Sequence, residues 1–169
     1  MSGSRQAYVA LGSNLGDRRK TLVSALAALA HEEGMRTLAC SRVYETEPEG
    51  PPQERYLNAV VRLETFLAPR ALLGRLLAIE VSHGRRRGPT RNAPRTLDLD
   101  LLLHGDDCLD ATDLVLPHPR MHLRAFVLEP LCELAPQLVH PRLGRTIREL
   151  AAGVRDPARV RVLEDPWPG

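Results

Sequence analysis

The sequence contains few aromatic residues and a single lysine. Tyr, Phe and Trp together make up 4% of its 169 residues, and Lys20 is the one lysine among 23 Lys and Arg side chains. RNA-binding modules stack bases on aromatic side chains beside a basic face, and this chain is poor in the residues that such a platform needs. Because the net charge is only +2, we expect no general nucleic-acid-binding surface.

Cysteines and long apolar runs are also scarce. Cys40, Cys108 and Cys132 lie far apart and show no Cys-x-x-Cys spacing, so we expect free thiols in a reducing compartment. The N-terminus has no apolar stretch typical of a signal peptide, and no run approaches the roughly 18 residues of a membrane span. The sequence therefore predicts a cytoplasmic protein without membrane partners, and we expect a monomer.

Hydrophobic patterns of strand and helix type alternate along the chain. With 43% hydrophobic residues, the length suits one compact domain, which we expect to span residues 1–169. Strands are predicted at 8–11, 35–46, 56–66 and 97–103, and helices at 22–30 and 69–84. This is the ferredoxin-like βαββαβ pattern. We predict an α+β fold with a mixed or antiparallel sheet, helices on one side, and additional C-terminal elements at 114–116, 121–134, 146–152 and 160–163.

The segment 85–103 carries the strongest signal for chemistry. Five arginines lie in a stretch that one glycine and two prolines keep out of regular structure, and a leucine-rich strand follows. Because side chains alternate along a strand, Asp98 and Asp100 project from one face, with Cα atoms about 6.5 to 7 Å apart. These carboxylates can hold one Mg²⁺ or a pair of ions, and the arginines beside them suit a polyphosphate.

The charged motifs have two other possible interpretations. The aspartates can end an edge strand and pair with Arg91 or Arg95, but carboxylates in so apolar a strand are costly to bury without a counter-charge, which favours a metal. A Walker-type phosphate loop that used Lys20 is excluded, because it would need glycines where Asn14 and Arg19 stand.

Other residues suit ligand binding from the loops and strand ends. Tyr56 and Asn58 project from the same strand face beside a proline-rich loop, which fits a flat, hydrogen-bonding ligand, although a rim tyrosine and a capping asparagine fit equally well. His118 lies between two prolines and suits a fixed ligand-facing group, but a lone histidine is more often structural. Arg124 and Phe126 are expected to begin a helix whose N-terminal end favours anions.

Several motifs, taken in order, resemble the 6-hydroxymethyl-7,8-dihydropterin pyrophosphokinase family of folate biosynthesis. The resemblance covers about residues 8 to 136 and leaves 137 to 169 as an extension of the same domain. It rests on Ala10-Leu11-Gly12-Ser13-Asn14-Leu15-Gly16, on Tyr44-Glu45-Thr46 with Tyr56-Leu57-Asn58-Ala59, on Gly84-Arg85-Arg86-Arg87 with Arg91-Asn92-Ala93-Pro94-Arg95-Thr96-Leu97-Asp98-Leu99-Asp100, and on Pro117-His118-Pro119-Arg120 through Phe126.

The resemblance implies transfer of pyrophosphate from ATP to the hydroxymethyl oxygen of the pterin, with release of AMP. It assigns two Mg²⁺ ions to Asp98 and Asp100, and catalysis to these aspartates with Arg85 and Arg95. The implied ATP-binding residues are cationic or imidazole side chains: Arg85, Arg87, Arg91, Arg95, His118 and Arg124. The implied pterin-binding residues are Thr46, Pro48, Tyr56, Asn58 and Phe126, of which Tyr56 and Phe126 would sandwich the ring.

The chain departs from the family at one position of the arginine loop. Asn92 stands where some members place an aromatic residue, so stacking by this loop on the pterin is not implied. Glu80 resembles a helix carboxylate that orients the arginines. Two alternatives remain, a metal-dependent transferase of the same fold that acts on another small acceptor and an RNA-binding module that uses the arginine loop.

Overall fold

In a computed structural model of the chain, the described residues are 3–48, 52–84, 96–155 and 159–163. The strands are β1 (Arg5–Ser13), β2 (Met35–Cys40), β3 (Tyr44–Thr46), β4 (Tyr56–Thr65), β5 (Asp98–His104), β6 (Leu109–Asp110), β7 (Val115–Leu116) and β8 (Val160–Val162). The helices are α1 (Arg18–His31), α2 (Pro69–Ser82), the 3-10 turn η1 (Met121–Leu123), α3 (Ala125–Leu134) and α4 (Ile147–Gly153). Within these ranges, no helix combines the length and apolar character needed to cross a membrane.

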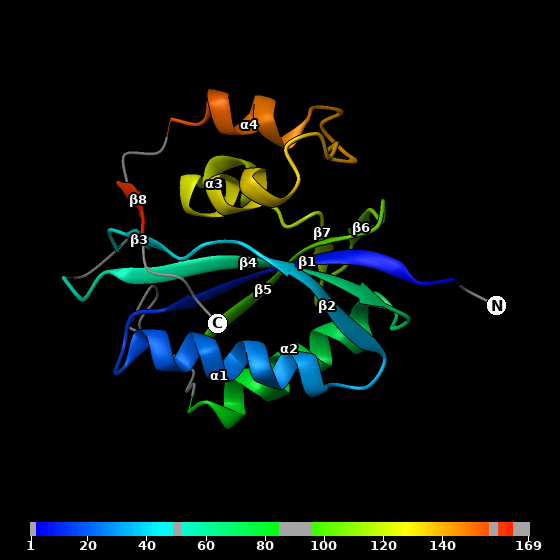
Figure 1. The fold of residues 1–169 in the computed structure, drawn as a ribbon. Coiled ribbons are helices and arrows are strands. Elements are labelled where there is room, and N and C mark those ends of the chain that lie inside the picture. The colour runs from blue at the N-terminus through cyan, green and yellow to red at the C-terminus, as the bar shows by residue number, and fades with distance from the viewer. Residues whose placement is uncertain (1–2, 49–51, 85–95, 156–158, 164–169) are drawn as a thin grey trace.

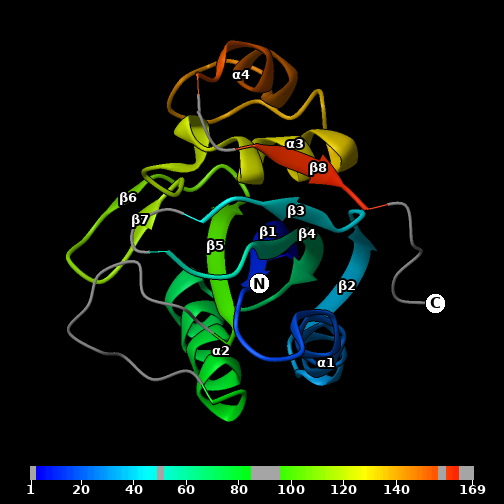
Figure 2. The same cartoon turned by 90° about the vertical axis from the view of Figure 1, so that its left-hand side faces the viewer.

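A six-stranded antiparallel sheet lies at the centre of the fold (Figures 1 and 2). Its order is β5-β1-β4-β3-β8, and β2 also pairs with β4. The pairings of β1 with β4 and β5, of β4 with β2 and β3, and of β3 with β8 are all antiparallel. β6 and β7 form a separate two-stranded ribbon. The predicted α+β class with an antiparallel sheet is confirmed.

Helices cover both faces of this sheet. α1 and α2 lie on one face, whereas α3, with α4 stacked on it, lies over the other (Figure 1). The side chains of the first core include Leu11, Leu63 and Leu72, and those of the second include Val60 and Leu128. The expectation of helices on one side holds for α1 and α2 but is wrong for α3 and α4. The reason is that the central strands are apolar on both faces and must be buried on both.

The helix starts follow from capping residues in the sequence. Asp17 precedes α1 and accepts a hydrogen bond from the backbone N of Lys20. Pro69 occupies the first turn of α2, where its missing N–H costs no hydrogen bond. Thr146 and Glu149 form a reciprocal capping box at the start of α4, which stabilises this short helix on the surface of α3.

The predicted strand at 35–46 is two strands separated by Ser41, Arg42 and Val43. Ser41 is buried, and its hydroxyl accepts a hydrogen bond at 2.9 Å from the backbone N of Val60, where the β ladder is interrupted. The break lets β2 and β3 follow β4 along different parts of its length.

The predicted helix at 121–134 is likewise divided. Arg124 has an extended conformation (φ −118°, ψ 112°) between the 3-10 turn and α3, so it precedes α3 as its N-cap residue. Pro130 lies inside α3. The single element predicted at 121–134 is therefore interrupted at Arg124, where the backbone is extended.

Candidate active site

Asp98 and Asp100 begin β5 at the edge of the sheet. The antiparallel register places Asp98 opposite Gly12 and Asp100 opposite Ala10 of β1. Leu99 and Leu101, on the other face of the strand, are buried in the core formed with α1 and α2. The alternation predicted from the Asp-Leu-Asp-Leu pattern is confirmed, and both carboxylates are half-buried on the face that α3 covers.

A cavity of about 80 Å³, which we call cavity A, opens on this face of the sheet. It lies among β1, β3, β4, β5 and α3. Its walls are Ala10, Leu11, Gly12, Thr46, Glu47, Tyr56, Asn58, Asp98, Asp100 and Phe126. Four of the five predicted pterin-binding residues are therefore brought together with both aspartates. The fifth, Pro48, is half-buried beside Glu47 and is not among the wall residues.

The polar floor of cavity A is fixed by a buried hydrogen bond. The Nδ2 atom of Asn58 donates to Oγ1 of Thr46 at 2.8 Å, and both side chains are almost fully buried. A Cβ atom at Gly12 would lie 3.1 Å from Oδ1 of Asn58 and 3.5 Å from Cδ1 of Tyr56. The glycine therefore leaves room above the polar edge of Asn58, whose Oδ1 is oriented toward it.

A second cavity of about 370 Å³, cavity B, lies on the other side of the aspartates. Its walls are Leu73, Leu77, Glu80, Asp98, Leu99, Asp100, Leu101, Thr112, Asp113, Leu114, Val115, His118 and Pro119. Leu73, Leu77 and Glu80 recur at helical spacing, so one face of α2 contributes all three. Cavities A and B share Asp98 and Asp100, and a ligand in either cavity would lie beside the same two carboxylates.

His118 is held neutral beside these carboxylates. The pKa of its imidazole is lowered from 6.5 to about 4, chiefly by burial and then by the charge of Arg124, while Asp98 acts in the opposite direction. The Nδ1 atom accepts a hydrogen bond from the backbone N of Arg120 at 3.1 Å, which leaves Nε2 as the protonated nitrogen. His118 can therefore donate a hydrogen bond into cavity B without carrying a charge.

Arg124 lies between His118 and Phe126. Its guanidinium carbon is 5.4 Å from the centre of the Phe126 ring, a cation–π distance that fixes the arginine next to the wall of cavity A. Because Arg124 precedes α3, its charge stands at the helix end that favours anions. This position suits a phosphate that lies between the two cavities.

The donor set at Asp98 and Asp100 suits Mg²⁺ better than a softer metal. In the part of the chain that the structure describes, no group of three or more His, Cys, Asp and Glu side chains is arranged to hold a metal. Hard carboxylate oxygens with few protein ligands fit Mg²⁺, which usually completes its shell with phosphate oxygens and water. Both carboxylates face cavities large enough for such ligands.

Four predicted ATP-binding arginines, Arg85, Arg87, Arg91 and Arg95, lie outside the described residues. Sequence reasoning missed Glu47 in cavity A and the leucines of α2 in cavity B. It also missed the role of Gly12, which lies within β1 and leaves space in cavity A beside Asn58. A glycine in an otherwise apolar strand was the signal that could have found it.

Comparisons with known proteins identify the family of the chain. The family model for 7,8-dihydro-6-hydroxymethylpterin-pyrophosphokinase (HPPK) matches residues 8–136. A protein of Synechocystis named 2-amino-4-hydroxy-6-hydroxymethyldihydropteridine pyrophosphokinase is 46% identical over 144 residues, which are 85% of this chain and 73% of the relative. The protein of the same name from Pseudomonas aeruginosa is 48% identical over 149 residues, covering 88% of this chain and 91% of the relative.

The fold also matches solved structures. A crystal structure of an HPPK-DHPS protein in complex with substrates superposes with a TM-score of 0.70 at 14% identity, over 88% of this chain. The chain spans 45% of that longer protein, so this likeness concerns the fold of one part of it. From the family match over most of its length and the similarity to full-length relatives, the chain belongs to the 7,8-dihydro-6-hydroxymethylpterin-pyrophosphokinase family.

Proposed function

We propose that the protein transfers pyrophosphate from MgATP to the hydroxymethyl oxygen of 6-hydroxymethyl-7,8-dihydropterin in folate biosynthesis. The observation that carries this function is that cavities A and B meet at Asp98 and Asp100. A transferase must hold its donor and its acceptor in contact, and two cavities with one shared acidic edge meet this requirement. The names of the relatives give the pteridine acceptor and the pyrophosphokinase activity, and ATP as the donor follows from the family resemblance.

Cavity A is proposed as the pterin site. Tyr56 and Phe126 are wall residues from β4 and α3, so a flat heterocycle can lie against aromatic rings. The Oδ1 atom of Asn58 can accept from the pterin edge, since Nδ2 is used by Thr46. Pro48 is proposed to contact the pterin from the loop that follows β3. In this proposed pose the hydroxymethyl group would face the aspartates, which line the same cavity.

Cavity B is proposed as the nucleotide site. Leucines of α2 and Val115 give it an apolar wall that can accept a base, and His118, whose imidazole senses the charge of Asp98, is also a wall residue. Neutral His118 would donate from Nε2 to a phosphate oxygen. Arg85, Arg87, Arg91, Arg95 and Arg124 are proposed to bind the phosphates, with Arg85 and Arg95 acting in catalysis. This assignment of the four loop arginines rests on the family resemblance.

Asp98 and Asp100 are proposed to hold two Mg²⁺ ions. When bound, Mg²⁺ neutralises phosphate charge and orients the phosphate chain for in-line displacement. In the reaction, the hydroxymethyl oxygen forms a bond to the β-phosphorus, and its proton passes to solvent. The bond from that phosphorus to the α–β bridging oxygen breaks, and AMP leaves. The residues of this chain contribute by holding both substrates in line and stabilising charge as it moves toward AMP.

Two further proposals concern architecture. The order β5-β1-β4-β3 with α1 and α2 on one face supports a ferredoxin-like core. The packing of α3 on β4 and the pairing of β8 with β3 support a single domain over residues 1–169, with 137–169 as an extension of the same unit. We propose that this domain acts as a monomer.

The test is an analysis of nucleotide products. The purified protein is incubated with MgATP and 6-hydroxymethyl-7,8-dihydropterin, and the products are separated by chromatography. We expect AMP to form in step with the pterin diphosphate and to be absent without the pterin. Formation of ADP, or of no product that depends on the pterin, would contradict this function and favour a different small acceptor in cavity A.

A further inference from the structure

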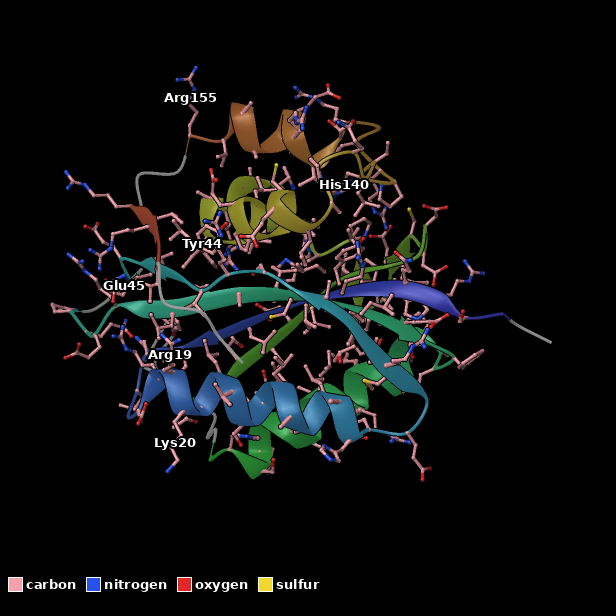
Figure 3. The ribbon with its side chains drawn as sticks, in the orientation of Figure 1. Arg19, Lys20, Tyr44, Glu45, His140 and Arg155 are labelled. Carbon is pink, nitrogen blue, oxygen red and sulfur yellow. The ribbon has the colours of Figure 1, made fainter. Side chains whose placement is uncertain are left out.

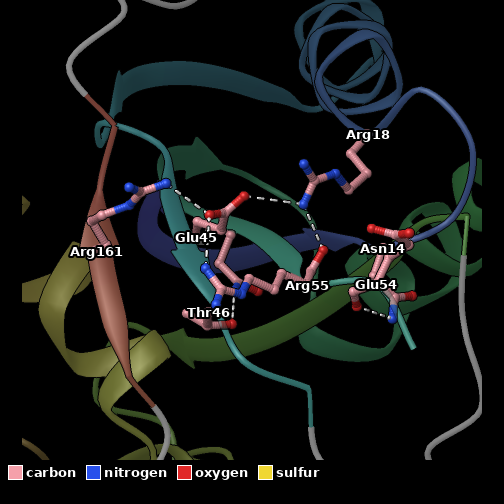
Figure 4. Close-up of polar contacts among 8 residues, drawn as sticks. Asn14, Arg18, Glu45, Thr46, Glu54, Arg55 and Arg161 are labelled. Atoms are coloured by element: carbon pink, nitrogen blue, oxygen red, sulfur yellow. Dashed lines mark hydrogen bonds and ion pairs between the residues drawn. The ribbon is translucent and has the colours of Figure 1, made fainter. Parts of the chain in front are cut away.

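Glu45 is a carboxylate on β3 that contacts arginines from three distant segments. Its Oε1 atom accepts a hydrogen bond from Nη2 of Arg161 on β8 at 2.9 Å, and Arg55 lies 3.6 Å from the same oxygen (Figure 4). Its Oε2 atom lies 3.4 Å from Nη1 of Arg18 at the start of α1. The Glu45 side chain is only 14% exposed, so its charge is partly shielded from water by these guanidinium groups.

Glu45 and Arg55 are both adjacent in sequence to residues that line cavity A. Thr46 directly follows Glu45, and Tyr56 directly follows Arg55. Arg18 also donates from Nη1 to the backbone oxygen of Arg55 at 2.7 Å. The Glu45 cluster, composed of Glu45, Arg18, Arg55 and Arg161, therefore fixes the backbone on both sides of the proposed pterin site.

The segment before Tyr56 is held from a second direction by Asn14. The Nδ2 atom of this buried side chain donates to Oε1 of Gln53 at 2.6 Å and to the backbone oxygen of Glu54 at 3.1 Å. Asn14 and Arg18 flank the turn between β1 and α1 (Figure 4). The start of β4 is thus attached to the first strand and helix of the chain.

The C-terminal strand completes the cluster. β3 has only three residues, and β8 pairs along its outer edge with Glu45 opposite Arg161 and Thr46 opposite Val160. The backbone N of Glu47, a wall residue of cavity A, also donates to the backbone oxygen of Arg159 at 3.3 Å. Opposite charges directly across two strands stabilise the pairing, so Arg161 attaches β8 through Glu45.

We propose that Glu45 is a positioning residue for the pterin side of the active site. It acts through Thr46 and Tyr56, touches neither substrate, and gives the C-terminal strand a role in acceptor binding. This role rests on the proposed function of cavity A. The walls of cavity B come from α2, β5 and the β7 region and include no residue of the Glu45 cluster, so we expect ATP binding to change little when Glu45 is replaced.

The test compares Glu45→Gln with Glu64→Gln in the full-length chain. Glu64 is a matched control, because it also forms an ion pair on the same sheet, with Arg36, but lies at the opposite end of β4. For each protein we would measure KM for the pterin and for MgATP, the pterin dissociation constant by fluorescence, and the thermal midpoint. Because partly exposed ion pairs are individually weak, we expect a moderate effect in Glu45→Gln: KM and Kd for the pterin should rise about three- to tenfold. KM for MgATP should stay within about twofold of the wild-type value.

A double-variant cycle separates positioning from general stability. Arg161→Gln should weaken pterin binding less than Glu45→Gln, and the double variant should resemble Glu45→Gln alone, because both changes remove the same contact. If Glu45→Gln and Glu64→Gln have the same pterin constants, or if both substrates are affected equally, the positioning role is wrong. A wild-type protein that neither binds the pterin nor releases AMP overturns the proposed function and this role with it.

Discussion

The Oε2 atom of Glu80 accepts a hydrogen bond at 2.6 Å from the backbone N of Leu99, the residue between Asp98 and Asp100. Glu80 lies on α2 and is 3% exposed. Among the strands that the structure describes, β5 pairs in this sheet with β1 alone, so none of them accepts a hydrogen bond from this N–H on the outer side of β5. The carboxylate of Glu80 accepts it instead, and it fixes the backbone that carries both proposed magnesium ligands.

The first prediction concerns this contact. Glu80→Ala leaves the Leu99 N–H buried without its acceptor, which costs about 1–3 kcal/mol, so the free energy of unfolding in urea should fall by that amount. Glu80→Gln keeps an acceptor oxygen and should lose much less. The concentration of Mg²⁺ needed for half-maximal activity should also rise in Glu80→Ala. Equal stability of the alanine and glutamine variants would show that the hydrogen bond contributes little.

Asp98→Asn and Asp100→Asn test the metal assignment. Each change replaces a hard anionic ligand with a neutral amide, so we expect turnover to fall by at least about 100-fold while the protein remains folded. Circular dichroism and the thermal midpoint check the fold. Asp110→Asn is the control, since Asp110 is exposed on β6 and pairs with Arg142. Unchanged kinetics in either aspartate variant would leave an edge-strand role for that residue.

His118 makes stability depend on pH. Its folded-state pKa of about 4 lies below the ordinary value of 6.5, so between these values the unfolded chain binds more protons than the folded one. The free energy of unfolding should therefore rise from pH 4 to pH 6.5, and this stabilisation is lost as the pH falls. His118→Gln should flatten the slope in urea titrations at a series of pH values. Burial also lowers the pKa of His140, which should leave a smaller residual slope.

Much of this fold could be predicted because its signals are local. The period-two alternation of β4 predicts that Leu57, Val61 and Leu63 share one face and that Asn58 lies on the other, and the structure confirms it. The same alternation predicts that Asp98 and Asp100 share one face of β5. Each of these strands has one strictly apolar face, and a shift of the strand register by one residue would expose that whole face to solvent. The sequence pattern is therefore enough to predict which side chains lie on the buried face.

What could not be predicted depends on partners far apart in the chain. Glu45 and Arg161 are 116 residues apart, and no local pattern marks them as a pair. The break at Ser41 follows from its hydrogen bond to Val60 on another strand. The second apolar face of the sheet is buried by α3, a contact between distant segments that local patterns do not indicate. Glu47 was not predicted as a cavity residue because its neighbours have the composition of a proline-rich loop. In the structure its backbone N donates to the backbone oxygen of Arg159, just before β8, and this contact holds Glu47 at the cavity.

Tyr44 attaches β3 to α3 on the face opposite the Glu45 cluster. Its hydroxyl donates to Oε1 of Glu133 at 2.7 Å, and Tyr44 lies between the sheet and α3 (Figure 3). Burial, followed by this carboxylate, raises the pKa of Tyr44 well above 10, so the hydroxyl stays protonated as the donor. Tyr44→Phe should lower the free energy of unfolding by about 1–2 kcal/mol. In a cycle with Glu133→Gln, additive losses would mean that the two groups do not interact energetically.

Gly12→Ala tests the shape of cavity A directly. The added methyl group would lie 3.1 Å from Oδ1 of Asn58, closer than an ordinary contact, and 3.5 Å from the Tyr56 ring. Because both neighbours are wall residues, the methyl group must displace them or occupy space meant for the acceptor. We expect KM for the pterin to rise by about tenfold or more, with KM for MgATP nearly unchanged, because a loss of about 1.4 kcal/mol corresponds to tenfold in binding.

The control for this change is Gly74→Ala. Gly74 lies inside α2, and a Cβ atom there meets nothing within 4 Å, so alanine should stabilise the helix by about 0.5–1 kcal/mol without changing either KM. Steady-state kinetics with each substrate varied in turn, together with thermal midpoints, would compare the two variants. If Gly12→Ala left pterin binding intact, Asn58 and Tyr56 could not form the acceptor wall. If it weakened both substrates equally, the methyl group would be acting through the shared aspartates, because Asp98 lies opposite Gly12 in the register of β1 and β5.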